Sequence, residues 1–249
     1  TNVEGGSFLR DGADTGAGNG IQIQFGVPEP NGETAQNIRI VDNEISDIST
    51  RDVGEIEGES GGTLAIGINV LPRGNDIRGL QIENNTIRSI EPGVPGEGDE
   101  TETRAISVDT QLDDPGRGSA SLNAAGQVSE LRVTNNTFTD LTAGDGVAAI
   151  TLFEDGRVSP RTGVENFEIR NNEFSRFDAN DEVAVFIGGY EDLGRHDISL
   201  NKFSDGNIIR FDGDQSGYDV SEADTLDARL NFYNGRLSND SITITGIGE

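Results

Sequence analysis

Three aspartates, Asp109, Asp113 and Asp114, stand close together where one apolar stretch ends. Hydrolysis of a glycosidic bond needs a carboxylic acid and a carboxylate within several ångströms of each other, and grouped aspartates can supply both. The alternative is a solvated acidic loop. The chain has 1 histidine, His196, and no carboxylate motif matches it, so a structural or surface role is the simpler interpretation.

A second acidic cluster suits a metal ion better than catalysis. Asp212, Asp214 and Ser216 have the spacing of the first half of a calcium loop, and Glu222 or Asp224 could close it. The twelfth position lacks the glutamate of an EF-hand. We therefore expect at most a shorter loop with one structural Ca²⁺, and an acidic turn is the alternative.

Asparagine sequons offer possible modification sites. They begin at Asn84, Asn135 and Asn239. The first two lie within a repeated phrase described below, so the repeat by itself can account for these sequons without any glycosylation. Asn239 is therefore the expected glycan acceptor.

The charge balance is strongly acidic, with 18 basic residues against 45 acidic ones and a formal net charge of −27. Such a surface repels itself in ordinary salt, whereas in molar salt the Debye length falls to about 3 Å and screens the repulsion. Acidic residues spread along the whole chain, with Lys202 as the one lysine, resemble the proteins of extreme halophiles, haloarchaea above all. No basic patch exists to neutralise phosphates, so nucleic acid is not an expected partner.

The chain contains no cysteine and no methionine. Disulfides and thiolate metal sites are therefore excluded. Because residue 1 is not methionine, we expect a processed mature form or a piece of a longer chain. No apolar run approaches the roughly 20 residues of a membrane span, so we do not expect the chain to cross a membrane.

One phrase recurs along the chain, with the consensus apolar, any, apolar, any, Asn or Asp, Asn, any, apolar. Full copies begin at residues 37, 79, 130 and 166, and a shortened copy begins at 197. Its period of two on each side of the Asn pair predicts strands. A second family of strands is expected between the copies, at 20–25, 64–70, 105–109, 149–153, 183–187 and 207–211.

Three short strands per repeat, with few tight hairpin turns, favour a solenoid in which each strand pairs with its equivalent about 4.8 Å along the axis. The expected inward residues are Ile38, Ile40, Ile45, Ile48, Leu80, Ile82, Ile87, Ile90, Leu131, Val133, Phe138, Leu141, Phe167, Ile169, Phe174 and Phe177. A column of Asn43, Asn85, Asn136, Asn172 and Asn201 is expected at a tight bend. Asparagine tolerates left-handed backbone there, and its amide can bond to the next coil.

The repeated phrase resembles those of the pectate-lyase-like, right-handed parallel β-helix superfamily, over roughly residues 20–235. Residues 226–235 resemble a phrase that follows the last coil, with Phe232 and Tyr233 where tryptophan is usual. The resemblance implies an all-β, single-stranded right-handed parallel β-helix of about six coils, with three strands per coil. We expect one domain over 1–249, with a lead-in at 1–19, coils at 20–235 and a tail at 236–249.

The resemblance also implies roles for the outward face of the first strands. There Arg39, Gln81, Arg132 and Glu168 form one expected column, and Val41, Glu83, Thr134 and Arg170 form the next. Acidic-polysaccharide lyases of this superfamily use Arg or Lys to abstract a proton, a part that Arg132 beside Glu168 could play. The alternative is an ion pair between coils.

The outer side of the intermediate strands suits sugar stacking. We expect Gly67, Ser107 and Thr151 in one column there and Asn69, Asp109 and Phe153 in another; Phe186 and Tyr190 follow nearby. Small polar residues with occasional aromatics form such a surface, and the expected sugar-binding residues are Asn69, Phe153, Phe186 and Tyr190. Long insertions are expected at two corners of the coil. One corner has residues 49–62 and 91–103, and the other has residues 71–78, 111–129 and 155–165. These insertions could form the sides of a groove, or they could be solvated loops without a binding role.

The sequence therefore favours a secreted or cell-surface halophilic β-helix that binds polysaccharide or glycan, without a demonstrable active site. A lyase or glycoside hydrolase acting on acidic polysaccharide is one alternative. A structural surface, filament or viral spike component is another, with self-association through coil ends or as part of a longer chain.

Overall fold

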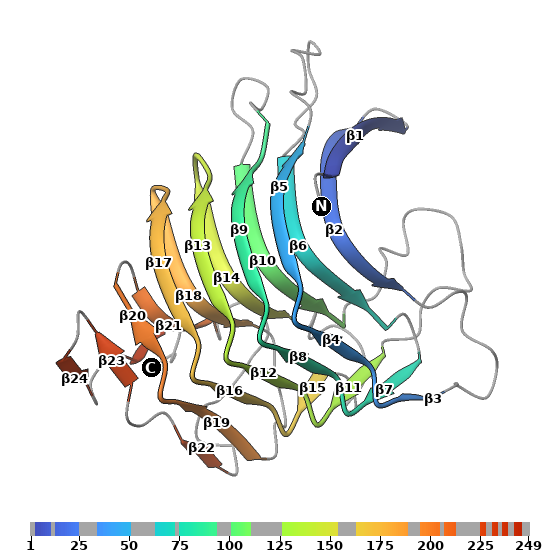
Figure 1. Ribbon diagram of the computed structural model, residues 1–249. Helices are drawn as coiled ribbons and strands as arrows, with labels where there is room; N and C mark the ends of the chain where they lie inside the picture. Colours follow the sequence, from blue (N-terminus) through green and yellow to red (C-terminus); the bar gives the residue numbers. More distant parts are fainter. Residues whose placement is uncertain are drawn as a thin grey trace.

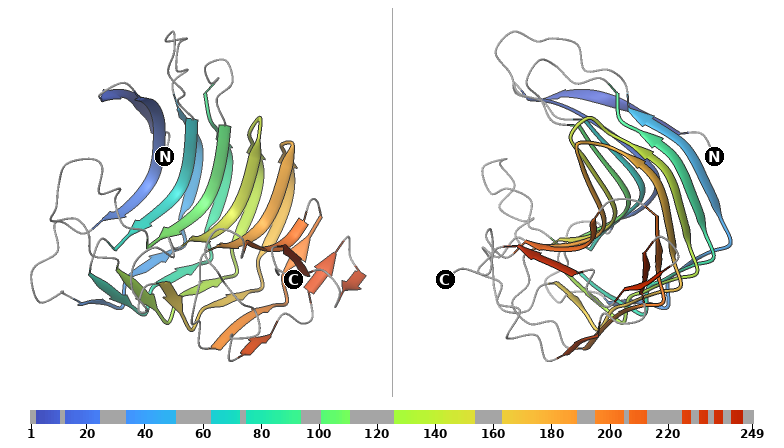
Figure 2. Two further views of the ribbon diagram at one scale, coloured as in Figure 1. Left: turned by 180° about the vertical axis from the view of Figure 1, so that it is seen from behind. Right: turned by 90° about the vertical axis from the view of Figure 1, so that its left-hand side faces the viewer.

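The structure is a computed structural model, and it describes residues 3–10, 13–24, 34–50, 63–72, 75–93, 101–110, 126–153, 163–188, 195–204, 207–212, 225–227, 231–233, 236–238 and 242–245. These residues form a solenoid of stacked, parallel strands (Figure 1). Seen nearly along the solenoid axis, the strands of successive coils superimpose (Figure 2, right).

Four parallel sheets, named A to D here, form the solenoid, and sheet C covers only the coils of β3 to β15. Sheet C contains β3 (Thr34–Gln36), β7 (Asp76–Arg78), β11 (Gln127–Ser129) and β15 (Gly163–Glu165). Sheet D contains β4 (Arg39–Val41), β8 (Gln81–Glu83), β12 (Arg132–Thr134), β16 (Glu168–Arg170), β19 (Arg195–Ser199) and β22 (Thr225–Asp227).

The other two sheets hold the longer strands. Sheet A contains β5 (Glu44–Thr50), β9 (Thr86–Glu91), β13 (Thr137–Thr142), β17 (Glu173–Asp178), β20 (Lys202–Phe203) and β23 (Asn231–Tyr233). Sheet B contains β2 (Ala13–Gln24), β6 (Thr63–Leu71), β10 (Thr101–Asp109), β14 (Gly146–Phe153), β18 (Asp181–Gly188), β21 (Asn207–Asp212) and β25 (Ile242–Thr245).

Each complete coil passes through the sheets in the order C, D, A, B, as in β7, β8, β9 and β10. Four strands per coil replace the three that the sequence predicts. The missed strands are those of sheet C, which contain one inward apolar residue each. Ile77, Val128 and Val164 are fully buried there, but one apolar residue in three gives no alternation to recognise.

Two antiparallel pairs interrupt the parallel order. Strand β1 (Val3–Arg10) pairs parallel with β5 at residues 3–5 and antiparallel with β2 at residues 6–10. It thereby joins sheets A and B into one 15-stranded sheet. Part of the expected lead-in at 1–19 is thus strand. Near the other end, β24 (Arg236–Ser238) pairs antiparallel with β23.

Left-handed backbone recurs every five residues within a coil. In the first complete coil it falls at residues 37, 42 and 47, between sheets C and D, between D and A, and inside β5. The equivalents in later coils are Gly79, Asn84, Ser89, Glu130, Asn135, Asp140, Asn166, Asn171 and Arg176. The extra left-handed residue inside each sheet A strand explains why Ile45 and Ile48, three residues apart, both face inward.

The predicted asparagine column is a hydrogen-bonded ladder. In each rung the amide oxygen of the next asparagine accepts both the backbone N–H and the side-chain amide of the one before. For Asn85 bonding to Asn136 Oδ1 these distances are 2.9 and 3.0 Å. The left-handed residue is the one before the ladder asparagine, for example Asn135 with φ 57°, so assigning that backbone to Asn136 itself was wrong. The ladder residue instead uses its amide to satisfy backbone groups at the bend.

The core is a continuous column of apolar side chains along the axis. All of the predicted inward residues belong to it; Ile38 is only partly buried, at its margin. Phe174 stacks on Phe138 and on Phe203 at centroid distances of 4.9 and 5.0 Å. Gly67 faces this core as well, because a Cβ added there would lie 2.9 Å from the side chain of Ile87.

Candidate functional site

The outer face of sheet B carries a mixed polar and aromatic column. Register places Asn69, Ser107, Thr151 and Phe186 side by side on four successive coils. This corrects the predicted columns, which grouped Gly67 with Ser107 and Thr151. Gly67 belongs instead to the inward side, because the strand kinks there and both Gly67 and Ile68 face the core.

Accessibility differs along this column. Asn69, Ser107 and Thr151 are buried, and the Asn69 amide donates to Asn19 Oδ1 at 3.2 Å. The hydroxyl of Thr151 is buried without a hydrogen-bond partner. Phe186 is only half-buried, so its ring is the accessible member of the column. The buried Thr151 hydroxyl is out of reach of a ligand, so the Phe186 ring is the group that this column can offer to a sugar.

The next outward position on sheet B lies at the carboxyl ends of the strands. Asp109, Phe153 and Asp212 occupy it, in register through Gly188. Asp109 is half-buried. Its predicted catalytic companions Asp113 and Asp114, and the predicted sugar-binding Tyr190, lie outside the described residues. Strands β10 and β14 end at this edge, and in the chain order sheet C strands follow them.

The outer face of sheet D carries the two columns that the sequence predicts. Register aligns Arg39, Gln81, Arg132 and Glu168, and beside them Val41, Glu83, Thr134 and Arg170. The first column continues to Asp197 on β19. Sequence reasoning missed Asp197 as part of this face, although the shortened fifth copy of the repeat aligns it with Glu168.

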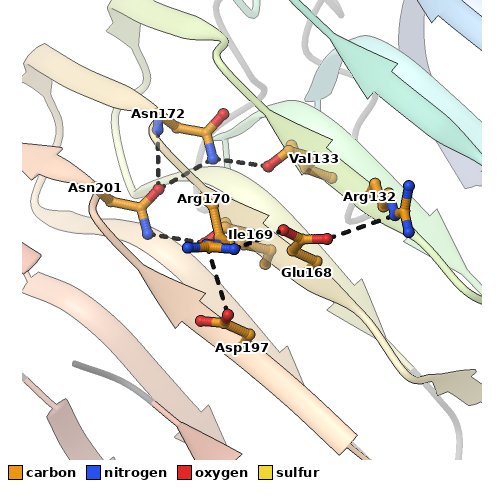
Figure 3. Close-up of polar contacts among 8 residues, drawn as sticks. All are labelled: Arg132, Val133, Glu168, Ile169, Arg170, Asn172, Asp197 and Asn201. Atoms are coloured by element: carbon orange, nitrogen blue, oxygen red, sulfur yellow. Dashed lines mark hydrogen bonds and ion pairs between the residues drawn. The ribbon is translucent and has the colours of Figure 1, made fainter. Parts of the chain in front are cut away.

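An ion-pair network connects three coils on this face (Figure 3). Arg132 Nε lies 3.5 Å from Glu168 Oε2, and Arg170 Nη1 lies 3.2 Å from Glu168 Oε1. Arg170 Nε lies 3.5 Å from Asp197 Oδ2. Arg132 and Glu168 are therefore together, as predicted, but as members of a network in which each carboxylate already has an arginine partner. This geometry agrees with the alternative interpretation of Arg132 and Glu168, in which they form an ion pair between coils.

Every basic side chain that the structure describes is paired with a carboxylate. Beside the network above, Arg88 lies 2.7 Å from Glu44, Arg176 lies 2.8 Å from Asp140 and Arg104 lies 2.7 Å from Glu102. The hydrogen bond that Arg88 donates to the carboxylate of Glu44 raises the pKa of Arg88 above its ordinary value. The remaining pairs are Arg39 with Glu83, Arg78 with Glu130 and Lys202 with Glu173. None of these eight side chains is left over for an anionic ligand; the side chains of Arg10, Arg195, Arg210 and Arg236 are not among those described.

The predicted calcium loop and glycan acceptor are mostly outside the described residues. Asp214, Ser216, Glu222, Asp224 and Asn239 lie there, and only the strand position of Asp212 is described. Among the described side chains, no group of three or more His, Cys, Asp or Glu could hold a metal ion.

Comparison of the chain with protein-family models, with curated proteins and with solved structures finds no match. Within the described ranges, no helix has the length and apolar character that a bilayer span requires. Any function must therefore be argued from the faces of the solenoid itself.

Proposed function

We propose that this chain is a secreted or cell-surface protein of a halophile, a right-handed parallel β-helix of the pectate-lyase-like type, which binds a polysaccharide or glycan along the outer face of sheet B. The observation that carries the proposal is the in-register column of Asn69, Ser107, Thr151 and Phe186, which continues at the backbone position of Arg210 on β21. Its coils repeat about every 4.8 Å, a spacing of the order of one sugar unit, so an extended glycan could meet one coil per sugar.

The chemistry of the column supports this class of ligand. Phe186 is half-buried and offers a ring face on which a sugar can stack. Asp109 lies one outward position further along the strands, where a carboxylate can accept from vicinal sugar hydroxyls. A structural Ca²⁺ held by Asp212, Asp214, Ser216 and Glu222 or Asp224 remains part of the proposal.

A binding role is favoured over catalysis. Glycoside hydrolysis needs two carboxyl groups flanking the bond, one as an acid and one as a base or nucleophile. On sheet D the candidates Glu168 and Asp197 share one guanidinium, that of Arg170. A lyase needs a basic group free to take a proton, and Arg132 is held by Glu168. Acting on acidic polysaccharide remains the second candidate, through Asp109 and its sequence neighbours.

The test is a binding screen in about 1 M sodium chloride, where the Debye length is about 3 Å. Neutral and acidic polysaccharides are compared by depletion of protein from solution, with and without Ca²⁺. The same mixtures are followed for unsaturated products and for new reducing ends. Binding without products supports the proposal; unsaturated products would establish a lyase, and reducing ends alone a hydrolase.

Substitution of Phe186 locates the site. Phe186→Leu keeps an apolar side chain but removes the ring face, so binding should weaken about fivefold, in line with about 1 kcal/mol for an aromatic contact. Phe186→Trp keeps a ring and should retain binding. Equal binding by both variants would move the site away from sheet B. Failure of folded protein to bind any member of a broad panel would refute the proposal and favour a structural component.

A further inference from the structure

The outer column of sheet D has an antisymmetric order of charge along the solenoid axis. Register places six residues in this axial row, one per coil: Arg39, Gln81, Arg132, Glu168, Asp197 and Asp227. The first half is basic or neutral and the second half is entirely acidic. A row of this kind is complementary to a copy of itself that runs in the opposite direction.

The same face is locally neutral. Through β19, the axial row and the neighbouring column together contain three arginines, at positions 39, 132 and 170, and three carboxylates, at positions 83, 168 and 197. The whole chain carries −27. Two copies that approach through an average face repel each other, whereas through this face the local charges cancel.

The charged side chains of this face are also available. Arg39 and Arg132 are 60% and 55% exposed, and Glu168 and Asp197 are 32% and 38% exposed. Their present partners lie within the same sheet, so a second layer of charges can join the pairs without burying an unpaired ion.

We propose that two copies of this chain associate face to face through the outer faces of sheet D, with their solenoid axes antiparallel. A two-fold axis parallel to the strands passes between the coils of Arg132 and Glu168. It places Arg132 of one copy opposite Glu168 of the other, Gln81 opposite Asp197, and Arg39 opposite the position of Asp227. In the neighbouring column it sets Thr134 opposite Arg170 and Glu83 opposite Ser199, so no like charges meet.

The size of the face sets the strength of this association. Six coils span about 24 Å and three residues of strand about 10 Å, so the contact is smaller than the roughly 1,200 Å² of a stable interface. We expect a dimer with a dissociation constant in the micromolar to millimolar range. The dimer should form in about 1 M salt, because the Debye length of about 3 Å there screens the repulsion between the two acidic chains. It should dissociate in about 0.01 M salt, because that repulsion then extends about 30 Å.

The experiment is sedimentation velocity over a wide range of protein concentration in about 1 M sodium chloride. Arg132→Glu and Glu168→Arg each bring like charges together at the two-fold axis, and each should raise the dissociation constant at least tenfold. The double variant Arg132→Glu/Glu168→Arg reverses both charges, so it should restore the dimer. Its rescue separates a charge contact from loss of folding.

A matched control uses the ion pair of Arg88 and Glu44 on sheet A, whose atoms lie 2.7 Å apart. Charge reversal of that pair, singly or together, should leave the dimer unchanged. A monomer at every concentration would overturn the inference, and so would a dimer that ignores all four sheet D and sheet A reversals. A polysaccharide that binds the monomer through sheet D, and loses affinity on Arg132→Glu, would assign this face to a glycan instead. Neither result depends on whether sheet B binds a ligand.

Discussion

Replacing Asn136 by alanine removes one complete step of the asparagine ladder. The side chain of Asn136 accepts the backbone N–H and amide of Asn85 at 2.9 and 3.0 Å. It donates to the carbonyl of Ile82 at 2.8 Å and to Asn172 Oδ1 at 3.1 Å. All four bonds are lost, and the buried N–H of Asn85 keeps no replacement partner.

The expected cost follows from these bonds. An orphaned buried donor costs about 1–3 kcal/mol and each of the three other lost hydrogen bonds about 1 kcal/mol, so the variant should lose about 5 kcal/mol of unfolding free energy. The matched comparison is Asn43→Ala in the first rung of the ladder. Asn43 is half-buried, its amide donates to Asn85 and Val41, and among the described residues no earlier rung donates to it. Two hydrogen bonds are lost there, so about 2 kcal/mol is expected.

The assay is urea unfolding in about 1 M sodium chloride, monitored by far-ultraviolet circular dichroism; salt screens the net charge while urea adds none. A difference of about 3 kcal/mol between the two variants is expected, a large fraction of the 5–15 kcal/mol typical of a domain. If Asn136→Ala is no more destabilising than Asn43→Ala, the ladder bonds do not stabilise the bend in the way described.

Gly67→Ala should lower the unfolding free energy by about 2 kcal/mol in the same assay, because its Cβ would lie 2.5 Å from a backbone oxygen of Ala105. Gly146→Ala, with no atom within 4 Å of its Cβ, should change the unfolding free energy by less than about 0.5 kcal/mol. Equal effects would contradict the packing described. Leu200 has a φ of 59°, where the equivalent residues of earlier coils are Asp or Asn. Leu200→Asn should therefore raise the unfolding free energy by about 1 kcal/mol. A lower unfolding free energy would show that the apolar contacts of Leu200 outweigh its backbone strain. Thr151→Val removes an unpartnered buried hydroxyl and should raise the unfolding free energy by about 1 kcal/mol. Destabilisation would mean that the hydroxyl has a partner.

The repeated phrase was sufficient to predict the solenoid, its inward residues and the asparagine column. These features are local, because alternation of period two and an Asn pair recur at each copy and every copy must bury the same side. The register of sheet D also followed from aligning the copies, which placed Arg132 beside Glu168 before any contact was known.

Three features did not follow from the sequence. The strands of sheet C are too short to alternate, and their pairing depends on neighbours one coil away, such as Ile77 beside Val128. The columns of sheet B were mispredicted by two residues, since Asn69 and not Gly67 pairs with Ser107. The lengths of the coils differ, and nothing in the local sequence sets which residues of neighbouring strands pair. The left-handed residue of the bend lies one position before the ladder asparagine, since both are often Asn and only their bonds distinguish them.

Sequence alone thus determined that the chain winds into stacked parallel strands, because periodicity and burial act within each repeat. Tertiary structure alone decided which outer side chains meet. The coils differ in length, so the sequence separation between two residues does not say whether they share a row. Residues 39 and 197 share one because each strand of sheet D pairs in register with the next. The charge order of sheet D and the buried hydroxyl of sheet B arise from that stacking, and both proposed surfaces depend on it.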